Sequence, residues 1–158
     1  MNQSDCLLSR RRQRGVAAVE LAIVLPILFV MMSVPIFFGR YFWHYTVAHK
    51  AAADAARYLS SISVREMRSS VLSEAARKTA YDIAAEEIAD LATGGDAPTI
   101  GVYCGTSKDC NGYGPTAMPS TVEVRVDMDM FDNIFGAVNT GFYGWNITAR
   151  AEVAYVGR

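Results

Sequence analysis

RRRQRGVAAVELAIVLPILFVMMSVPIFFGR, residues 10–40, is the stretch that decides the fold. Its 23 residues from Val16 to Phe38 contain one ionisable side chain, Glu20. At about 1.5 Å per residue, a helix of this length crosses the roughly 30 Å hydrocarbon core of a bilayer. A soluble helix of the same length would show polar residues along one face. We therefore expect a membrane-spanning helix at residues 16–39.

The composition of this stretch favours insertion by a clear margin. Its 14 Val, Leu, Ile and Phe residues contribute about −4 to −8 kcal/mol, against at most about +3 kcal/mol for Glu20. A secretory signal would end a shorter apolar region, of about 7–15 residues, with an A-x-A-like cleavage site. No such site follows Phe38. The span is therefore expected to be retained as an anchor.

A basic cluster immediately before the span predicts its orientation. The cluster consists of Arg10, Arg11, Arg12 and Arg14. The positive-inside rule keeps such a cluster in the cytoplasm. The sequence thus divides into a basic cytoplasmic leader at residues 1–15, a transmembrane helix at 16–39 and an exterior domain at 40–158, in an N-in/C-out orientation.

The residues around Gly15 resemble those of a known family. Arg14-Gly15, followed by four small or apolar residues and Glu20, looks like the site at which prepilin peptidases cut after a glycine. The run from Arg14 to Pro26 resembles the start of TadE-like pseudopilins of the tight adherence (Flp) pilus system. The likeness extends more loosely through Gly39-Arg40 to the alanine-rich run at residues 51–58.

This resemblance implies a protein of the bacterial inner membrane with a periplasmic domain, which either enters an extracellular pilus or only assists its assembly. It implies cleavage between Gly15 and Val16. Glu20 would then be the fifth residue of the mature chain and a registry charge paired with the new amine. The implied partners are prepilin peptidase, other pilins and pseudopilins, the inner-membrane pilus assembly platform and the lipid bilayer.

Glu20 also has an explanation that does not depend on the family. A carboxylate at low dielectric is favoured by a nearby cation and by the first turns of a helix, and cleavage would place an α-amino group one turn away. The alternative is an uncleaved anchor in which Glu20 reaches the membrane interface. Both interpretations are open at the level of the residues.

Further features of the span concern its path and its outer end. Pro26 and Pro35 each remove a backbone donor and are expected to kink the helix. Tyr41, Trp43 and Tyr45 are typical of the aromatic belt at which a helix leaves the bilayer.

Beyond the span, the pattern predicts two helices. Apolar residues from Phe42 to Leu59 recur at steps of three and four, so the membrane helix is expected to continue as an amphipathic segment to about Leu59. Ser63 and Glu66 have the spacing of a capping box. A second helix is therefore expected from about Val64 to Ala92, ended by the glycines at 94 and 95.

The C-terminal half predicts a small antiparallel sheet. Thr121 to Met130 alternates strictly between apolar and polar residues, Asn146 to Val156 does so nearly as well, and a short strand is expected at Ile100 to Cys104. Half-buried strands need a cover, which the helices supply. The expected fold class is α+β, with a sheet of two to four strands packed against helix.

Two of the three cysteines are expected to form a disulfide. Cys104 and Cys110 lie on the oxidising side of the membrane in this topology, whereas Cys6 is a free thiol of the leader.

The remaining composition argues against an enzyme, a metal site and nucleic-acid binding. The chain has 158 residues and a net charge of −1, which allows one modest exterior domain and offers no basic surface. His44 and His49 are five residues apart and cannot chelate one metal from a helix face. Asp127 and Asp129 fall on the polar face of a predicted strand, so a solvated face is expected there and not a cation site. No acid/base, nucleophilic or cofactor constellation is visible.

The sequence is therefore interpreted as a non-enzymatic pseudopilin or minor pilin, processed by prepilin peptidase and taking part in assembly of a Flp-type adhesive pilus. Two alternatives remain: an uncleaved single-pass membrane-anchored binding or sensor module, and a pseudopilin of a secretion system. Cleavage at Gly15 would distinguish the pseudopilin from the uncleaved membrane-anchored module. Co-purification with pilus or with secretion components would distinguish the pilus protein from a pseudopilin of a secretion system.

Overall fold

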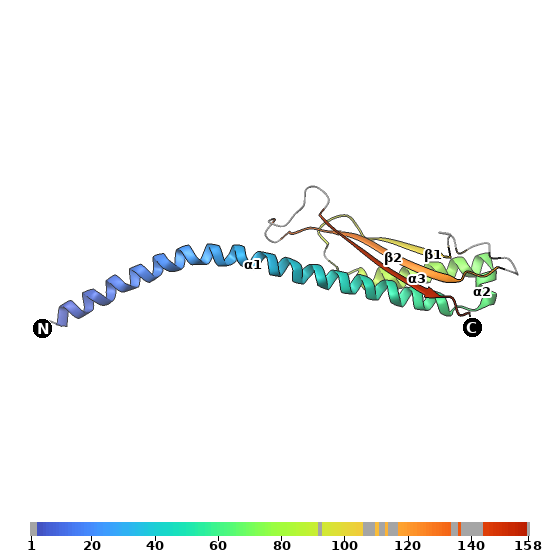
Figure 1. Ribbon diagram of the computed structural model, residues 1–158, viewed down its shortest axis with the longest axis horizontal. Coiled ribbons are helices and arrows are strands. Elements are labelled where there is room, and N and C mark those ends of the chain that lie inside the picture. Colours follow the sequence, from blue (N-terminus) through green and yellow to red (C-terminus); the bar gives the residue numbers. More distant parts are fainter. Residues whose placement is uncertain are drawn as a thin grey trace. The chain divides into compact units, whose positions relative to one another are not determined.

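The computed structural model describes the backbone of residues 3–91, 93–105, 110, 113, 117–133, 136 and 144–157, with side chains from residue 15 onward. The elements follow in the order α1 (Gln3–Ser61), α2 (Val64–Arg68), α3 (Ser70–Ile88), β1 (Thr99–Cys104), β2 (Thr121–Met130) and β3 (Trp145–Ala154) (Figure 1). The chain forms two compact units, Met1–Gly39 and Arg40–Arg158. The expected α+β class is confirmed.

The first unit is the N-terminal part of α1. The helix begins at Gln3, so the leader shares its helical backbone with the expected span. Pro26 and Pro35 lie inside α1, which continues as one helix through both residues (Figure 1). Near the second proline, Ser33 Oγ donates a hydrogen bond to Val30 O at 2.7 Å. This i−3 bond gives the hydroxyl a partner within the helix itself.

In the second unit, the C-terminal part of α1 buries a stripe of small residues. Each of its members is fully buried: Ala48, Ala51, Ala52, Ala55, Ala56 and Leu59. Alanines let a helix approach its neighbours closely and still remove apolar surface from water. The helix ends at Ser61, two residues after the predicted end, and the chain terminus packs there. Val156 N–H donates to Ser60 O at 3.2 Å, and Tyr155 Oη donates to Ile62 O at 3.0 Å.

The capping box predicted at the next helix start is present. Ser63 N–H donates to Glu66 Oε2 at 2.9 Å, and Glu66 N–H donates to Ser63 Oγ at 3.2 Å. Hydrogen bonds from the Ser63 hydroxyl and then from its backbone N–H lower the pKa of Glu66 below its ordinary value. Two helical donors are thus satisfied reciprocally at the start of α2.

The prediction of one continuous helix from Val64 to Ala92 is wrong. The chain leaves the helical region at Ser69, with φ −84° and ψ 119°. Ser69 Oγ then accepts a hydrogen bond from Leu72 N–H at 3.4 Å and so caps α3. Serine competes with the helix by bonding to nearby backbone, which favours a break at this position. α3 also ends at Ile88, before the two glycines that were expected to stop it.

The sheet has the order β1-β2-β3, with antiparallel pairs throughout. The strict alternation predicted for β2 is confirmed, because every second residue of the strand is buried: Val122, Val124, Val126, Met128 and Met130. Ile147 and Ala149 of β3 lie on the same face. Figure 1 shows the strands lying over α3 and the second half of α1, and α3 packs against β1.

The polar face of the sheet carries a register that opposes like charges. Glu123 lies directly opposite Glu152, and Arg125 lies directly opposite Arg150. Each arginine forms an ion pair with a carboxylate that is not directly opposite it. Arg150 Nε lies 2.8 Å from Glu123 Oε1, and Arg125 Nε lies 2.9 Å from Asp127 Oδ2. This arrangement leaves Glu152 without an ion pair among the described residues.

We predict that Glu152→Lys stabilises the second unit, because it converts one like-charged cross-strand pair into an opposite pair. The expected rise in the free energy of unfolding is roughly 0.5–1 kcal/mol. Urea unfolding of the full chain in detergent micelles measures it. Glu152→Gln, which removes only the repulsion, should give a smaller rise. A loss of stability in both variants would contradict the register.

Cys104 and Cys110 lie at disulfide distance near the end of β1. Cys104 Sγ and Cys110 Sγ are 2.11 Å apart, and both residues are fully buried. Tyr113 Oη donates a hydrogen bond to Cys104 O from the same region, and burial raises the pKa of Tyr113. The pair predicted from the sequence is therefore brought together by the fold.

Replacing both residues by alanine should lower the free energy of unfolding by about 2 kcal/mol, because a short closed loop is released in the unfolded chain. Urea unfolding of the oxidised chain and of the Cys104→Ala/Cys110→Ala variant measures the difference. Reductant should lower the stability of the natural chain and leave the variant unchanged. Cys6→Ala is the matched control and should behave as the natural chain does. Equal stability of the natural chain with and without reductant would contradict this prediction.

Candidate functional site

The apolar part of α1 exposes large side chains on all sides. Between Val16 and Ile36, exposed fractions of the large apolar residues range from 38% at Leu25 to 72% at Met31. These residues are Val16, Val19, Leu21, Ile23, Val24, Leu25, Ile27, Leu28, Phe29, Val30, Met31, Met32, Val34 and Ile36. In the part of the chain that the structure describes, α1 is the one helix long and apolar enough to cross a membrane. Its most apolar stretch is mostly exposed, unlike the core helix of a soluble protein.

Gly15 lies in open space within the described part of the structure. It lies inside α1, is exposed, and a Cβ added to it would meet no atom within 4 Å. Its φ is not among the positive values found at other glycines. Glycine inside a helix is less stable than alanine by about 0.5–1 kcal/mol. Gly39, also exposed inside α1 with nothing within 4 Å of an added Cβ, shares this geometry.

Glu20 lies one turn after Val16 on the same helix. Its side chain is exposed, and none of the described side chains pairs with it. The backbone of the four leader arginines belongs to α1, but the side chains of Arg10, Arg11, Arg12 and Arg14 lie outside the described part of the chain. Gly15, Val16 and Glu20 thus belong to one contiguous exposed segment. Its carboxylate has no ion-pair partner among the described side chains.

The two histidines and Asp127 each have a neighbour within the described structure, although His44 Nε2 is buried without a hydrogen-bond partner among the described groups. His44 Nδ1 lies 2.7 Å from Arg40 O in the preceding turn, and the His49 ring lies 4.4 Å from that of Tyr45. Asp127 accepts from Thr148 Oγ1 at 2.7 Å. Among the residues with described side chains, no three His, Cys, Asp or Glu gather where they could hold a metal ion.

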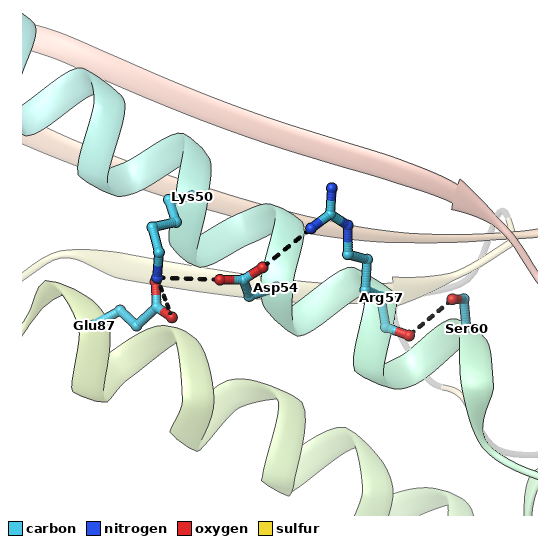
Figure 2. A network of polar contacts seen from close by, with 5 residues as sticks. All are labelled: Lys50, Asp54, Arg57, Ser60 and Glu87. Atoms are coloured by element: carbon cyan, nitrogen blue, oxygen red, sulfur yellow. Dashed lines mark hydrogen bonds and ion pairs between the residues drawn. The ribbon is translucent and has the colours of Figure 1, made fainter.

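A polar network that the sequence did not reveal joins α1 to α3 (Figure 2). Lys50 Nζ lies 2.8 Å from Glu87 Oε1 and 3.1 Å from Asp54 Oδ2, and Arg57 Nη1 lies 3.5 Å from Asp54 Oδ1. The hydrogen bond to Glu87, followed by that to Asp54, raises the pKa of Lys50 above its ordinary 10.5. The spacing of Lys50 and Asp54 at i and i+4 was readable, but the partner 37 residues away was not.

The alanine-rich end of α1 and the exposed segment at its start belong to one sequence unit. Residues 15–57 match the family model described as TadE-like protein. This segment is similar to TadE-like proteins. The resemblance predicted from the run beginning at Arg14 is thereby confirmed, and it is consistent with a pilin-related protein of the tight adherence system. No curated protein and no solved structure matches the chain.

The TadE-like segment covers a particular part of the fold. It begins at Gly15, includes Glu20 and both helix prolines, and ends at Arg57 within the helix that packs on the sheet. α2, α3 and all three strands lie beyond it. The similarity to the TadE-like family therefore concerns the apolar helix and its alanine stripe. The family match does not extend to the sheet.

Removing either partner of the Lys50–Glu87 pair should destabilise the second unit. Glu87 Oε2 is buried with no hydrogen-bond partner among the described groups, so Lys50→Met leaves this carboxylate without its cation. In urea unfolding at neutral pH, we expect Lys50→Met/Glu87→Gln to lose less stability than the two single losses combined. Strictly additive losses would contradict the coupling.

The same pair predicts a pH dependence. Because the folded pKa of Lys50 is raised, its contribution is fully present below its ordinary value of 10.5 and is lost as pH rises through the folded pKa. The stability difference between the natural chain and Lys50→Met should therefore shrink in strong alkali and at high salt.

Proposed function

We propose that this chain is a pseudopilin or minor pilin, cleaved by prepilin peptidase between Gly15 and Val16, that takes part in assembly of a Flp-type adhesive pilus. The peptidase hydrolyses one peptide bond. Water supplies the hydroxyl of a new carboxyl group on Gly15 and a proton to the new amine of Val16. The observation that carries the proposal is the TadE-like match, which begins at Gly15.

The orientation follows from the charge of the leader. The four arginines hold the N-terminus in the cytoplasm, so the sheet domain lies on the periplasmic side of the inner membrane. Cleavage removes these four arginines and one aspartate, and the net charge of the chain changes from −1 to −4. The basic anchor of the cytoplasmic end is thereby lost, which makes withdrawal of the helix from the membrane easier.

Glu20 acts as a registry charge after cleavage. The new α-amino group at Val16 lies one helical turn from the Glu20 carboxylate, or next to the carboxylate of a neighbouring chain. A paired charge in an apolar environment is favoured over an isolated one, and such pairs specify register in some assemblies. Among the described side chains no competing partner occupies Glu20.

The exposed apolar surface of α1 serves two successive environments. Lipid covers it while the protein waits in the membrane, and apolar helices of other pilins and pseudopilins cover it in the assembly. Transfer between two apolar surroundings needs little free energy, whereas transfer through water would be costly. The assembly platform of the inner membrane is the partner expected to guide this transfer, and the exterior domain supplies the contact surface.

Gly15→Trp should abolish processing, because the peptidase must approach the backbone at this residue. Intact mass and N-terminal sequencing of the protein from its native membrane measure the result. The natural chain should begin at Val16 and should retain its leader in cells whose prepilin peptidase is inactive. Gly39→Trp is the matched control, since Gly39 is also an exposed helical glycine with open space around it.

A chain that begins at Met1 whether or not the peptidase is active would overturn this proposal. The protein would then be an uncleaved membrane-anchored binding or sensor module. A terminus at Val16 combined with co-purification of secretion components, in place of pilus components, would assign the processed chain to a secretion system.

A further inference from the structure

Three aromatic side chains just after the apolar stretch of α1 point away from the domain. The exposed fractions of Phe42, Trp43 and Tyr45 are 61%, 65% and 40%. We call these three residues the aromatic cluster. Other residues of the same helical turns are buried, with His44 at 5% exposure and Ala48 at 0%. Large exposed aromatic surface of this kind marks a site of contact with another molecule or with lipid.

The structure separates these residues from the aromatic residue next to them. Tyr41 Oη donates to Asn146 O at 3.4 Å, and the Tyr41 ring lies edge-on to Trp145 at 6.1 Å between centroids. Tyr41 therefore serves the contact between α1 and the start of β3. The sequence alone grouped Tyr41 with Trp43 and Tyr45, but within the described structure the outward-facing residues of this turn are Phe42, Trp43 and Tyr45.

The position of the aromatic cluster along the chain limits what can cover it. Phe42 follows Phe38, the last residue of the apolar run, by four residues. Because α1 is helical through these residues, Phe42 lies about 6 Å and Tyr45 about 10 Å beyond Phe38 along the helix axis. The headgroup layer on each side of a bilayer is roughly 5–8 Å thick. Phe42 and Trp43 therefore fall within or next to this layer if residues 16–38 cross the hydrocarbon core.

The charged residues that follow mark where water begins. Lys50, Asp54 and Arg57 form the network on the next turns of α1, and the Lys50 and Arg57 side chains are 65% and 75% exposed. Apart from Arg40, which precedes the aromatic cluster, the exposed face of α1 thus changes from aliphatic to aromatic to charged, in the order that a bilayer changes from hydrocarbon to headgroups to water. An interface with a second protein would not require this order.

We propose that Phe42 and Trp43 insert into the periplasmic headgroup layer, with Tyr45 at its outer edge, and that the three side chains hold the base of the exterior domain against the membrane. This inference rests on the proposed transmembrane placement of α1. Tryptophan and tyrosine are suited to this layer because their rings are apolar and their N–H and O–H groups bond to water and headgroups. Since Tyr41 ties the same turn of α1 to Asn146, the start of β3 lies next to the membrane surface.

Fluorescence quenching in vesicles of phosphatidylethanolamine and phosphatidylglycerol tests the proposal. The chain has two tryptophans, Trp43 and Trp145. Subtracting the emission of the Trp43→Phe variant from that of the natural chain isolates the signal of Trp43. The Trp145→Phe variant, whose one tryptophan is Trp43, reports the same signal directly. We expect a blue-shifted emission that lipids brominated near the glycerol quench more strongly than lipids brominated near the chain ends. Aqueous iodide should quench Trp43 less than it quenches the urea-unfolded chain.

A second reporter separates this proposal from the membrane placement itself. Phe29→Trp, in a chain carrying Trp43→Phe and Trp145→Phe, lies near the middle of the apolar run and should be quenched most by the deepest bromines. Suppose that the deepest bromines do quench the tryptophan at position 29. If iodide then quenches Trp43 freely, or if no bromolipid quenches Trp43, the aromatic cluster lies in water or under protein and the inference is overturned. If no bromolipid quenches the Phe29→Trp chain, the transmembrane placement fails together with it.

Discussion

The first half of α1 cannot leave its apolar surface in water, and this requirement dominates the energetics of the first unit. Fourteen large apolar side chains between Val16 and Ile36 stand at least one-third exposed. Full burial of each would contribute about 1.5–3 kcal/mol, and because these side chains are on average roughly half exposed, covering what remains is worth on the order of 10–20 kcal/mol. This equals or exceeds the total stability of a typical domain, about 5–15 kcal/mol. The helix therefore needs an apolar cover, and it is long and apolar enough to cross a membrane.

The same helix meets a different requirement in its second half. There the buried positions are mostly alanine, which contributes little surface per residue but lets the backbone of α1 lie close to its neighbours. One helix thus joins a segment that is apolar on all sides to a segment with one narrow buried stripe. The TadE-like match spans both segments and stops before the sheet, which indicates that these two requirements together define the shared part of the chain.

Local patterns predicted the helices and strands well where a short-range signal exists. The alternation in Thr121 to Met130 and the capping box at Ser63 need only neighbouring residues, and both are as expected. The break at Ser69 was missed because a serine inside an otherwise helical pattern signals a cap only when its side chain turns to bond Leu72. At the candidate site, Gly15 and Glu20 were identified from sequence, whereas the open space around Gly15 needed coordinates.

The apolar helix, its amphipathic continuation and the two long strands could be predicted from the sequence, because hydropathy and periodicity act over a few residues. The cysteine pair followed from Cys104 and Cys110 being the two cysteines outside the leader. Only the tertiary structure decided that Lys50 bonds Glu87, that Glu123 faces Glu152 and that Tyr41 turns toward β3 while Trp43 turns outward. Each of these depends on which distant segments meet and in what register. The free energy that selects a register is summed over the whole sheet and its helical cover, so no single stretch of sequence contains it.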